Sequence, residues 1–99
     1  MRRALAIDEA SFGKDHPMVA NRLNNLAKLL QASDRLAEAE PFMRRALEIF
    51  VAFTVKTGHP HPHLEAVTKN YRRLLIKMGD TEEQAEKKIA KILAPIPKQ

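Results

Sequence analysis

The sequence contains no cysteine and no tryptophan, and aromatic residues make up only 5% of it. Without cysteine the chain can form neither disulfide bonds nor thiolate metal sites. This is typical of a reducing compartment, and we expect a cytoplasmic protein. The most apolar run, IFVAF at 49–53, is far shorter than the ~20 residues that cross a bilayer, so we expect no membrane partner. The scarcity of aromatic side chains argues against nucleic-acid binding, which the net charge of +5 alone does not predict.

An internal repeat organises the chain, which at 99 residues is long enough for one domain. MRRALAI at 1–7 recurs as MRRALEI at 43–49. HPMVANRLNNLAKLL at 16–30 is echoed by HPHLEAVTKNYRRLL at 61–75, with an offset of 45 residues. The sequence therefore predicts two similar units, preceded by part of another.

Apolar residues recur with a helical period in every segment, and no segment alternates with the period of a strand. Val19, Leu23, Leu26 and Leu30 form one such stripe. Glycines, prolines and a Ser-Asp pair separate the segments. The sequence therefore predicts an all-α protein built from antiparallel helix-turn-helix repeats. Five helices are expected, at 1–12, 17–32, 35–54, 62–78 and 81–94.

The units resemble the tetratricopeptide repeat (TPR), a helix pair that needs small residues where its two helices approach closely. The matching residues of LNNLAKLL and AEPFM are Leu23, Leu26, Ala27, Leu30, Ala39 and Met43. The unit length and the His-Pro opening are similar to the kinesin-light-chain type of repeat. The resemblance implies a single TPR domain over 1–99, a C-terminal fragment of a longer superhelical array. In it, 1–12 is the second helix of a truncated repeat, 17–54 a complete repeat and 62–94 a terminal capping repeat.

The second unit departs from the repeat pattern. Arg72 occupies the position of Ala27, where close packing needs a small residue. We therefore expect looser packing at this point. Degenerate polar repeats are typical of the caps that end repeat arrays.

The resemblance also implies where a partner binds, because the first helix of each TPR unit lines a concave surface. The candidate peptide-binding groove consists of Asn21, Asn24, Lys28, Gln31, Lys69, Arg73 and Lys77. The neutral side chains can hydrogen-bond an extended peptide backbone, and the cationic row can attract carboxylates or phosphates. We therefore expect a non-catalytic protein–protein interaction module that binds an extended, acidic peptide. One alternative is a structural cap of a longer superhelix with no ligand of its own. Another is that the charges serve only solubility.

The segment TGHPHPHLEAV at 57–67 places His59, His61 and His63 on alternate positions. They form either a weak surface metal site or the entry to a helix. We favour the helix entry, because alternate residues of an extended run point to opposite sides and do not converge on one ion. FGKDHP lacks the second glycine of a phosphate loop, and no carboxylate pair or serine stands in a catalytic pattern. The sequence therefore predicts no enzyme, no metal site and no cofactor.

The run IFVAF in the helix expected at 35–54 is unusually apolar. Phe50, Val51 and Phe53 cannot all face one stripe of a helix. Either neighbouring helices cover this helix on two sides, or the run forms an exposed patch for a partner. We favour cover on two sides.

If the segment 1–12 is the second helix of a truncated repeat, its apolar residues, including Leu5 and Ile7, need cover, and we expect one face of this helix to lack its partner. Burying an aliphatic side chain contributes about 1.5–3 kcal/mol, so an uncovered face favours association. Two copies could cover each other through two-fold pairing. We therefore predict weak, concentration-dependent self-association through residues 1–12. Sedimentation equilibrium over a wide concentration range tests it, and a strict monomer at high concentration contradicts it.

Overall fold

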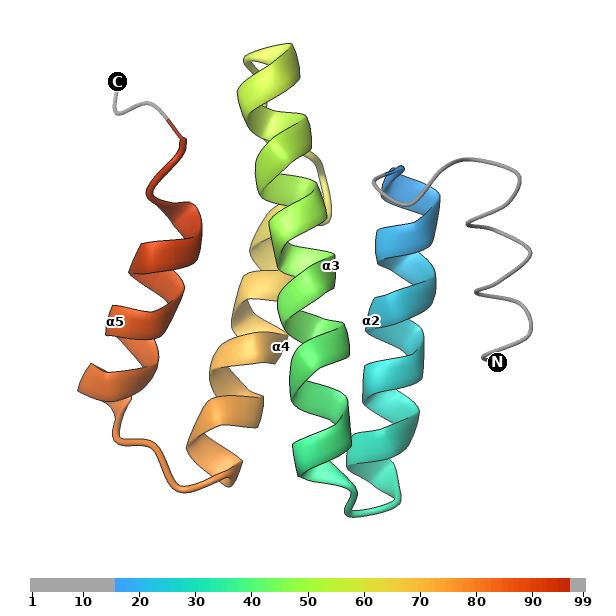
Figure 1. Cartoon of the computed structure of the whole chain (residues 1–99), viewed down its shortest axis with the longest axis vertical. Helices are drawn as coiled ribbons and strands as arrows, with labels where there is room; N and C mark the ends of the chain where they lie inside the picture. The colour runs from blue at the N-terminus through green and yellow to red at the C-terminus, as the bar shows by residue number, and fades with distance from the viewer. Residues whose placement is uncertain (1–15, 97–99) are drawn as a thin grey trace.

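Figure 1 shows the chain in a computed structural model that describes residues 16–96. Within this range the helices are α2 (Pro17–Ala32), α3 (Leu36–Thr57), α4 (Leu64–Lys77) and α5 (Glu82–Leu93), and there is no strand. Successive helices run antiparallel, which confirms the predicted all-α class of helix-turn-helix repeats. The helix expected at 1–12, and the self-association predicted for it, lie outside the described residues.

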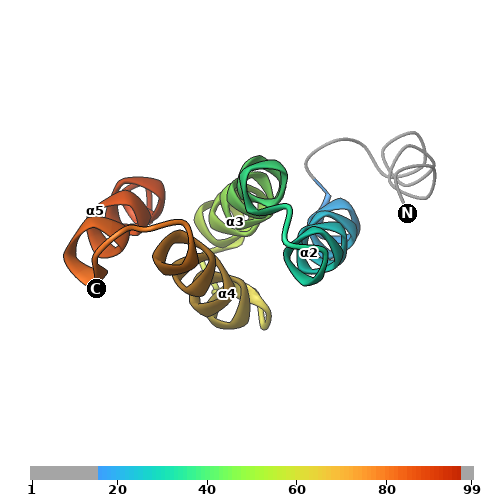
Figure 2. The same ribbon diagram turned by 90° about the horizontal axis from the view of Figure 1, so that it is seen from below.

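The helices form two layers. Seen end-on in Figure 2, α2 and α4 lie in one layer, and α3 and α5 lie in the other. We call α2 and α4 the inner helices, and α3 and α5 the outer helices. Each helix packs on the next in the chain, and α3 additionally contacts α5. Helix α3 therefore has neighbours on both sides, and both inner helices are positioned by packing on it.

The core is tightest between α2 and α3. Ala27 of α2 and Ala39 and Ala46 of α3 are fully buried, and these small residues allow the two helices to approach closely. The larger Leu23 and Met43 fill the remaining space and are equally inaccessible. The residues that carry the TPR resemblance in this unit are thus core residues.

The IFVAF run is covered on two sides. Phe50 is completely buried and the adjacent Val51 is 4% exposed, although successive residues of a helix point about 100° apart. On the α4 side, the Phe50 ring lies 4.5 Å from the imidazole of His61, and Phe53 lies 5.0 Å from the same imidazole. The first interpretation of this run is confirmed for Ile49, Phe50 and Val51, which are buried, whereas Ala52 is exposed.

Three of the four described helices differ from their predicted bounds. Helix α3 extends to Thr57 rather than residue 54, because its terminator is Gly58, which adopts a left-handed φ of 78° and donates its amide to Thr54. Helix α4 begins at Leu64 rather than residue 62, because Pro62 and the following residue form a turn before it. The bounds of α2 are those predicted, and α5 is one residue shorter at each end.

The repeat is visible in the way each inner helix begins. In front of α2, Nδ1 of His16 accepts the amide of Met18 at 3.0 Å. In front of α4, Nδ1 of His61 accepts the amide of His63 at 3.1 Å. The two histidines stand at equivalent positions of the repeat. Each imidazole accepts a backbone amide at the start of an inner helix, which is the helix-entry role that we favoured for the histidine segment.

The inner helices also end alike. After α2, the amide of Arg35 donates to the carbonyl of Leu30, across a turn in which Asp34 has a φ of 60°. After α4, the amide of Asp80 donates to the carbonyl of Leu75, and the residue with positive φ is Gly79, at 110°. Both turns are Schellman caps, which need a residue that tolerates the left-handed region.

The pairing of α4 with α5 is more polar than that of α2 with α3. The guanidinium of Arg72 reaches across to the carboxylates of Glu86 at 3.4 Å and Glu82 at 4.0 Å on α5. Arg72, which forms these ion pairs, occupies the repeat position that the buried Ala27 occupies in the first unit. A guanidinium between the helices is consistent with the looser packing expected at Arg72.

The two Schellman caps predict opposite effects of two substitutions. In Gly79→Ala the added methyl group would meet no atom within 4 Å, so the cost is conformational alone. We expect the free energy of unfolding to fall by about 1 kcal/mol. Asp34→Gly relieves the corresponding backbone strain in the first unit and should raise the free energy of unfolding slightly. Urea denaturation measures both, and equal stability of Gly79→Ala and the parent protein would contradict the assignment of the cap.

Candidate functional site

A polar hollow of about 310 Å³ lies between the two inner helices, beside the C-terminal halves of both. Helix α2 contributes Lys28 and Gln31, and helix α4 contributes Arg73 and Lys77. These are four of the seven groove residues expected from the sequence. Asn70 and Ala32 complete the lining. We call this cavity the inner hollow.

Helical spacing explains why these side chains meet. On α2, Lys28 and Gln31 are three residues apart and stand on the side of the helix away from its buried stripe. On α4, Arg73 and Lys77 are four residues apart and lie on one face, with Asn70 one turn before Arg73. Because both inner helices pack on α3, their exposed faces are held side by side.

The inner hollow is positively charged. Lys28, Arg73 and Lys77 are all exposed, and no acidic side chain lines the cavity. Within residues 16–96 none of these three cations forms an ion pair, although nearby cations such as Lys69 and Arg72 do. The side-chain amides of Gln31 and Asn70 likewise make no hydrogen bond to the described part of the chain. The hollow therefore offers three unneutralised charges and two amide groups to a ligand.

Lys69 does not belong with Arg73 and Lys77. Its ammonium lies 3.2 Å from the carboxylate of Glu65, one turn earlier on α4. It lines a different, largely apolar hollow between the start of α4 and the end of α5. Four residues turn an α-helix by about 40° more than one full turn. Residues 69, 73 and 77 therefore do not lie in a straight line along α4, and Lys69 at one end of the row faces away from the inner hollow.

The asparagines expected in the groove stand apart from the inner hollow. Asn21 and Asn24 are half-buried and do not line it. The carbonyl oxygen Oδ1 of Asn24 is buried, with no hydrogen-bond partner in the described structure. In this arrangement that oxygen is not available to a peptide. Sequence reasoning missed Asn70, whose signal is its spacing of three residues from Arg73.

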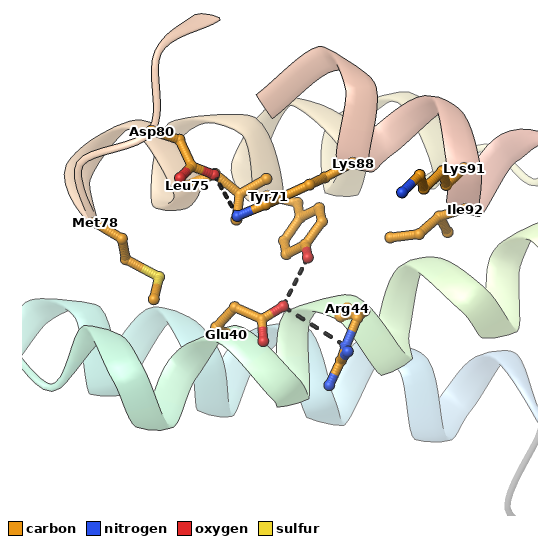
Figure 3. A pocket seen from close by; sticks show the side chains of 9 residues that line it. All are labelled: Glu40, Arg44, Tyr71, Leu75, Met78, Asp80, Lys88, Lys91 and Ile92. Carbon is orange, nitrogen blue, oxygen red and sulfur yellow. Dashed lines mark hydrogen bonds and ion pairs between the residues drawn. The ribbon is translucent and has the colours of Figure 1, made fainter. Parts of the chain in front are cut away.

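In a second cavity, the outer hollow, both acidic side chains of the lining are paired within the protein (Figure 3). It measures about 460 Å³ and is lined by α3, α4 and α5. The hydroxyl of Tyr71 donates to the Glu40 carboxylate at 2.6 Å, and that carboxylate also lies 3.6 Å from Arg44. Across the cavity, Lys88 donates to Asp80 at 2.8 Å. Its acids are matched by donors from the protein itself, unlike the cations of the inner hollow.

Of the three histidines in the 57–67 segment, only His61 is partly buried, whereas His59 and His63 are exposed. The rings of His61 and His63 lie 5.3 Å apart, and the His61 ring packs against Phe50 at an interplanar angle of 36°. Burial, together with the neighbouring His63, lowers the pKa of His61. Within residues 16–96 no three histidine, acidic or cysteine side chains are grouped so that they could hold a metal ion. In the same range no helix is both long and apolar enough to cross a bilayer.

The comparisons with known proteins bear on the first half of the chain. A family model described as a tetratricopeptide repeat matches residues 1–50, which is half of the sequence. The matched range contains α2 and most of α3, with the buried small residues of their interface. No curated protein and no solved structure matches the chain.

Tyr71 provides a direct test of the outer hollow, because it is the only tyrosine of the sequence. Burial raises the pKa of Tyr71, and the hydrogen bond to Glu40 raises it further. The folded-state pKa thus exceeds the value of ~10 in unfolded chains, so stability is expected to fall as the pH rises above ~10. Phenolate absorbance should therefore appear at higher pH in the folded protein than in urea, and Glu40→Gln should reduce this difference. Titration of Tyr71 at the same pH in both states would contradict the contact.

Proposed function

Because the chain belongs to the tetratricopeptide repeat family, whose stacked units form extended binding surfaces, we propose that it is a non-catalytic protein–protein interaction module. Its ligand is an extended, acidic segment of a partner protein. The segment lies across the inner helices, with carboxylates in the inner hollow. The observation that carries this proposal is the set of three cations without acidic partners.

The chemistry of the inner hollow supports an acidic ligand. A cation that is already paired gains little from a new carboxylate, because it must first give up its own partner. Lys28, Arg73 and Lys77 have no partner to lose within the described structure. Arg73 can also bind a carboxylate through two parallel hydrogen bonds. An acidic segment is therefore favoured over a neutral or basic one.

The flanking groups support an extended segment. Gln31 and Asn70 can each donate and accept hydrogen bonds, which is what a peptide backbone without secondary structure requires. They lie on different helices, so a segment that contacts both must cross from α2 to α4. The inner hollow lies on this path, because both helices line it.

A structural role is the second candidate. Lys69 is paired with Glu65, and Arg72 joins α4 to α5 through two glutamates. These contacts favour a terminal repeat that caps and stiffens a longer superhelix without a ligand. They account for Lys69, but they leave Arg73 and Lys77 without a role. The kinesin-light-chain type of repeat is a further proposal, supported by the histidine entry shared by both units.

Charge reversal in the inner hollow tests the proposal. The double variant Lys28→Glu/Arg73→Glu should weaken binding of a short, fluorescently labelled Asp/Glu-rich peptide by at least about tenfold, equal to ~1.4 kcal/mol. Both residues are exposed, so the fold should survive, and circular dichroism checks this. Fluorescence anisotropy measures affinity, which should also fall with added salt.

The matched control is Lys69→Glu, which reverses a charge on the same helix but outside the inner hollow. It should weaken binding much less than Arg73→Glu alone. If the two single variants lose the same affinity, the peptide responds only to net charge and the site assignment is wrong. If the parent protein does not bind the peptide, the proposed binding function is wrong and the structural role is favoured.

A further inference from the structure

The charge of the inner hollow exceeds what one carboxylate can neutralise. Lys28, Arg73 and Lys77 bring three positive charges to one cavity, and its lining contains no acid. A single Asp or Glu side chain supplies one negative charge and two acceptor oxygens. With such a ligand, at least two cations keep their mutual repulsion. The cavity therefore favours a ligand group of higher charge over a single carboxylate.

The helix ends do not supply the missing negative charge. The hollow lies near the C-termini of both inner helices, where unsatisfied carbonyls carry about half a negative charge per helix. The Schellman caps occupy these carbonyls. The amides of Ser33, Asp34 and Arg35 donate to the last turn of α2, and those of Met78, Gly79 and Asp80 donate to the last turn of α4. Even without these caps, the two dipoles together amount to one charge against three.

We infer that the preferred ligand group of the inner hollow is a phosphate monoester on a phosphorylated side chain of the partner. This inference rests on the proposed function and specifies the anion. A phosphate monoester carries about −1.5 to −2 charges near neutral pH and three strong acceptor oxygens. The oxygens can meet Lys28 from one inner helix and Arg73 and Lys77 from the other. The guanidinium of Arg73 supplies the planar fork, and the two lysines supply compact charges.

The shape of the inner hollow favours a phosphate carried on a side chain. It is an open cavity on the surface, and its cations are solvent-exposed. A group at the tip of a protruding side chain can enter such a cavity while its backbone is held outside by the amides of Gln31 and Asn70. A free phosphate ion would gain only the charge contacts and lose this support. A nucleic-acid phosphodiester carries a single charge, and the cavity lacks an aromatic ring on which a base could stack.

The experiment compares three peptides that differ at one central position, which is serine, glutamate or phosphoserine. The phosphoserine peptide should bind about tenfold more tightly than the glutamate peptide. Its affinity should fall as the pH is lowered through ~6, where phosphate takes up a proton, while that of the glutamate peptide changes little. Equal affinities for phosphoserine and glutamate would overturn the inference but leave the proposed function intact. Failure of all three peptides to bind would overturn both.

Two variants separate the recognition of phosphate from net charge. Arg73→Lys keeps the charge but removes the fork, so it should weaken binding of the phosphoserine peptide several-fold although the net charge is unchanged. Lys28→Gln removes one of the three cations, whereas the control Lys69→Gln removes a paired charge outside the cavity. Equal effects of Lys28→Gln and Lys69→Gln on the phosphoserine peptide would overturn the inference.

The source of the phosphate is tested by competition. Inorganic phosphate and a single-stranded oligonucleotide should displace the labelled phosphoserine peptide only at concentrations far above that of the unlabelled peptide. Displacement by inorganic phosphate at the peptide's own concentration would show that the ligand is the free ion. Displacement by the oligonucleotide at that concentration would show a nucleic-acid phosphate. Either result would overturn the assignment to a phosphorylated partner.

Discussion

The burial of α3 on two sides is the constraint on which the rest of the structure depends. This helix carries the largest fully buried side chain, Phe50, and presents apolar residues to both inner helices. A helix with so wide an apolar surface is stable only when neighbours cover both sides. Covering α3 fixes the places of α2 and α4, and with them the distance between their exposed faces. The inner hollow thus exists because two helices meet the same third helix.

The two polar cavities show how one fold uses charge in two ways. In the outer hollow, Tyr71 of α4 donates to Glu40 of α3, which connects the two repeat units through a partly buried hydrogen bond. Such a bond to a charged acceptor typically contributes about 1.5–3 kcal/mol, so it stabilises the junction of the units. In the inner hollow the three cations have no acidic partner within the described structure. Like charges gathered on one surface without acidic partners attract ligands of opposite charge.

Sequence reasoning predicted what depends on local pattern. The helical periods and the breakers were sufficient for the all-α class and for the bounds of α2, and the TPR resemblance was sufficient for the burial of Ala27 and Ala39. The end of α3 was placed too early. Its last turn contains no breaker, and helix formation continues until Gly58 offers a left-handed cap. Boundaries of this kind depend on one residue's backbone conformation rather than on a pattern.

The candidate site was predicted only in part, because it depends on the rotation of helices relative to one another. Spacing placed Lys69, Arg73 and Lys77 in one row, yet the row turns around α4 and separates Lys69 from the other two. Spacing within α2 likewise could not show that Lys28 and Gln31 face the hollow while Asn21 and Asn24 do not. Which end of a polar row faces a neighbouring helix is decided by side-chain packing at the interface, here the contacts of α2 and α4 with α3. The sequence of either inner helix, taken alone, does not contain that information.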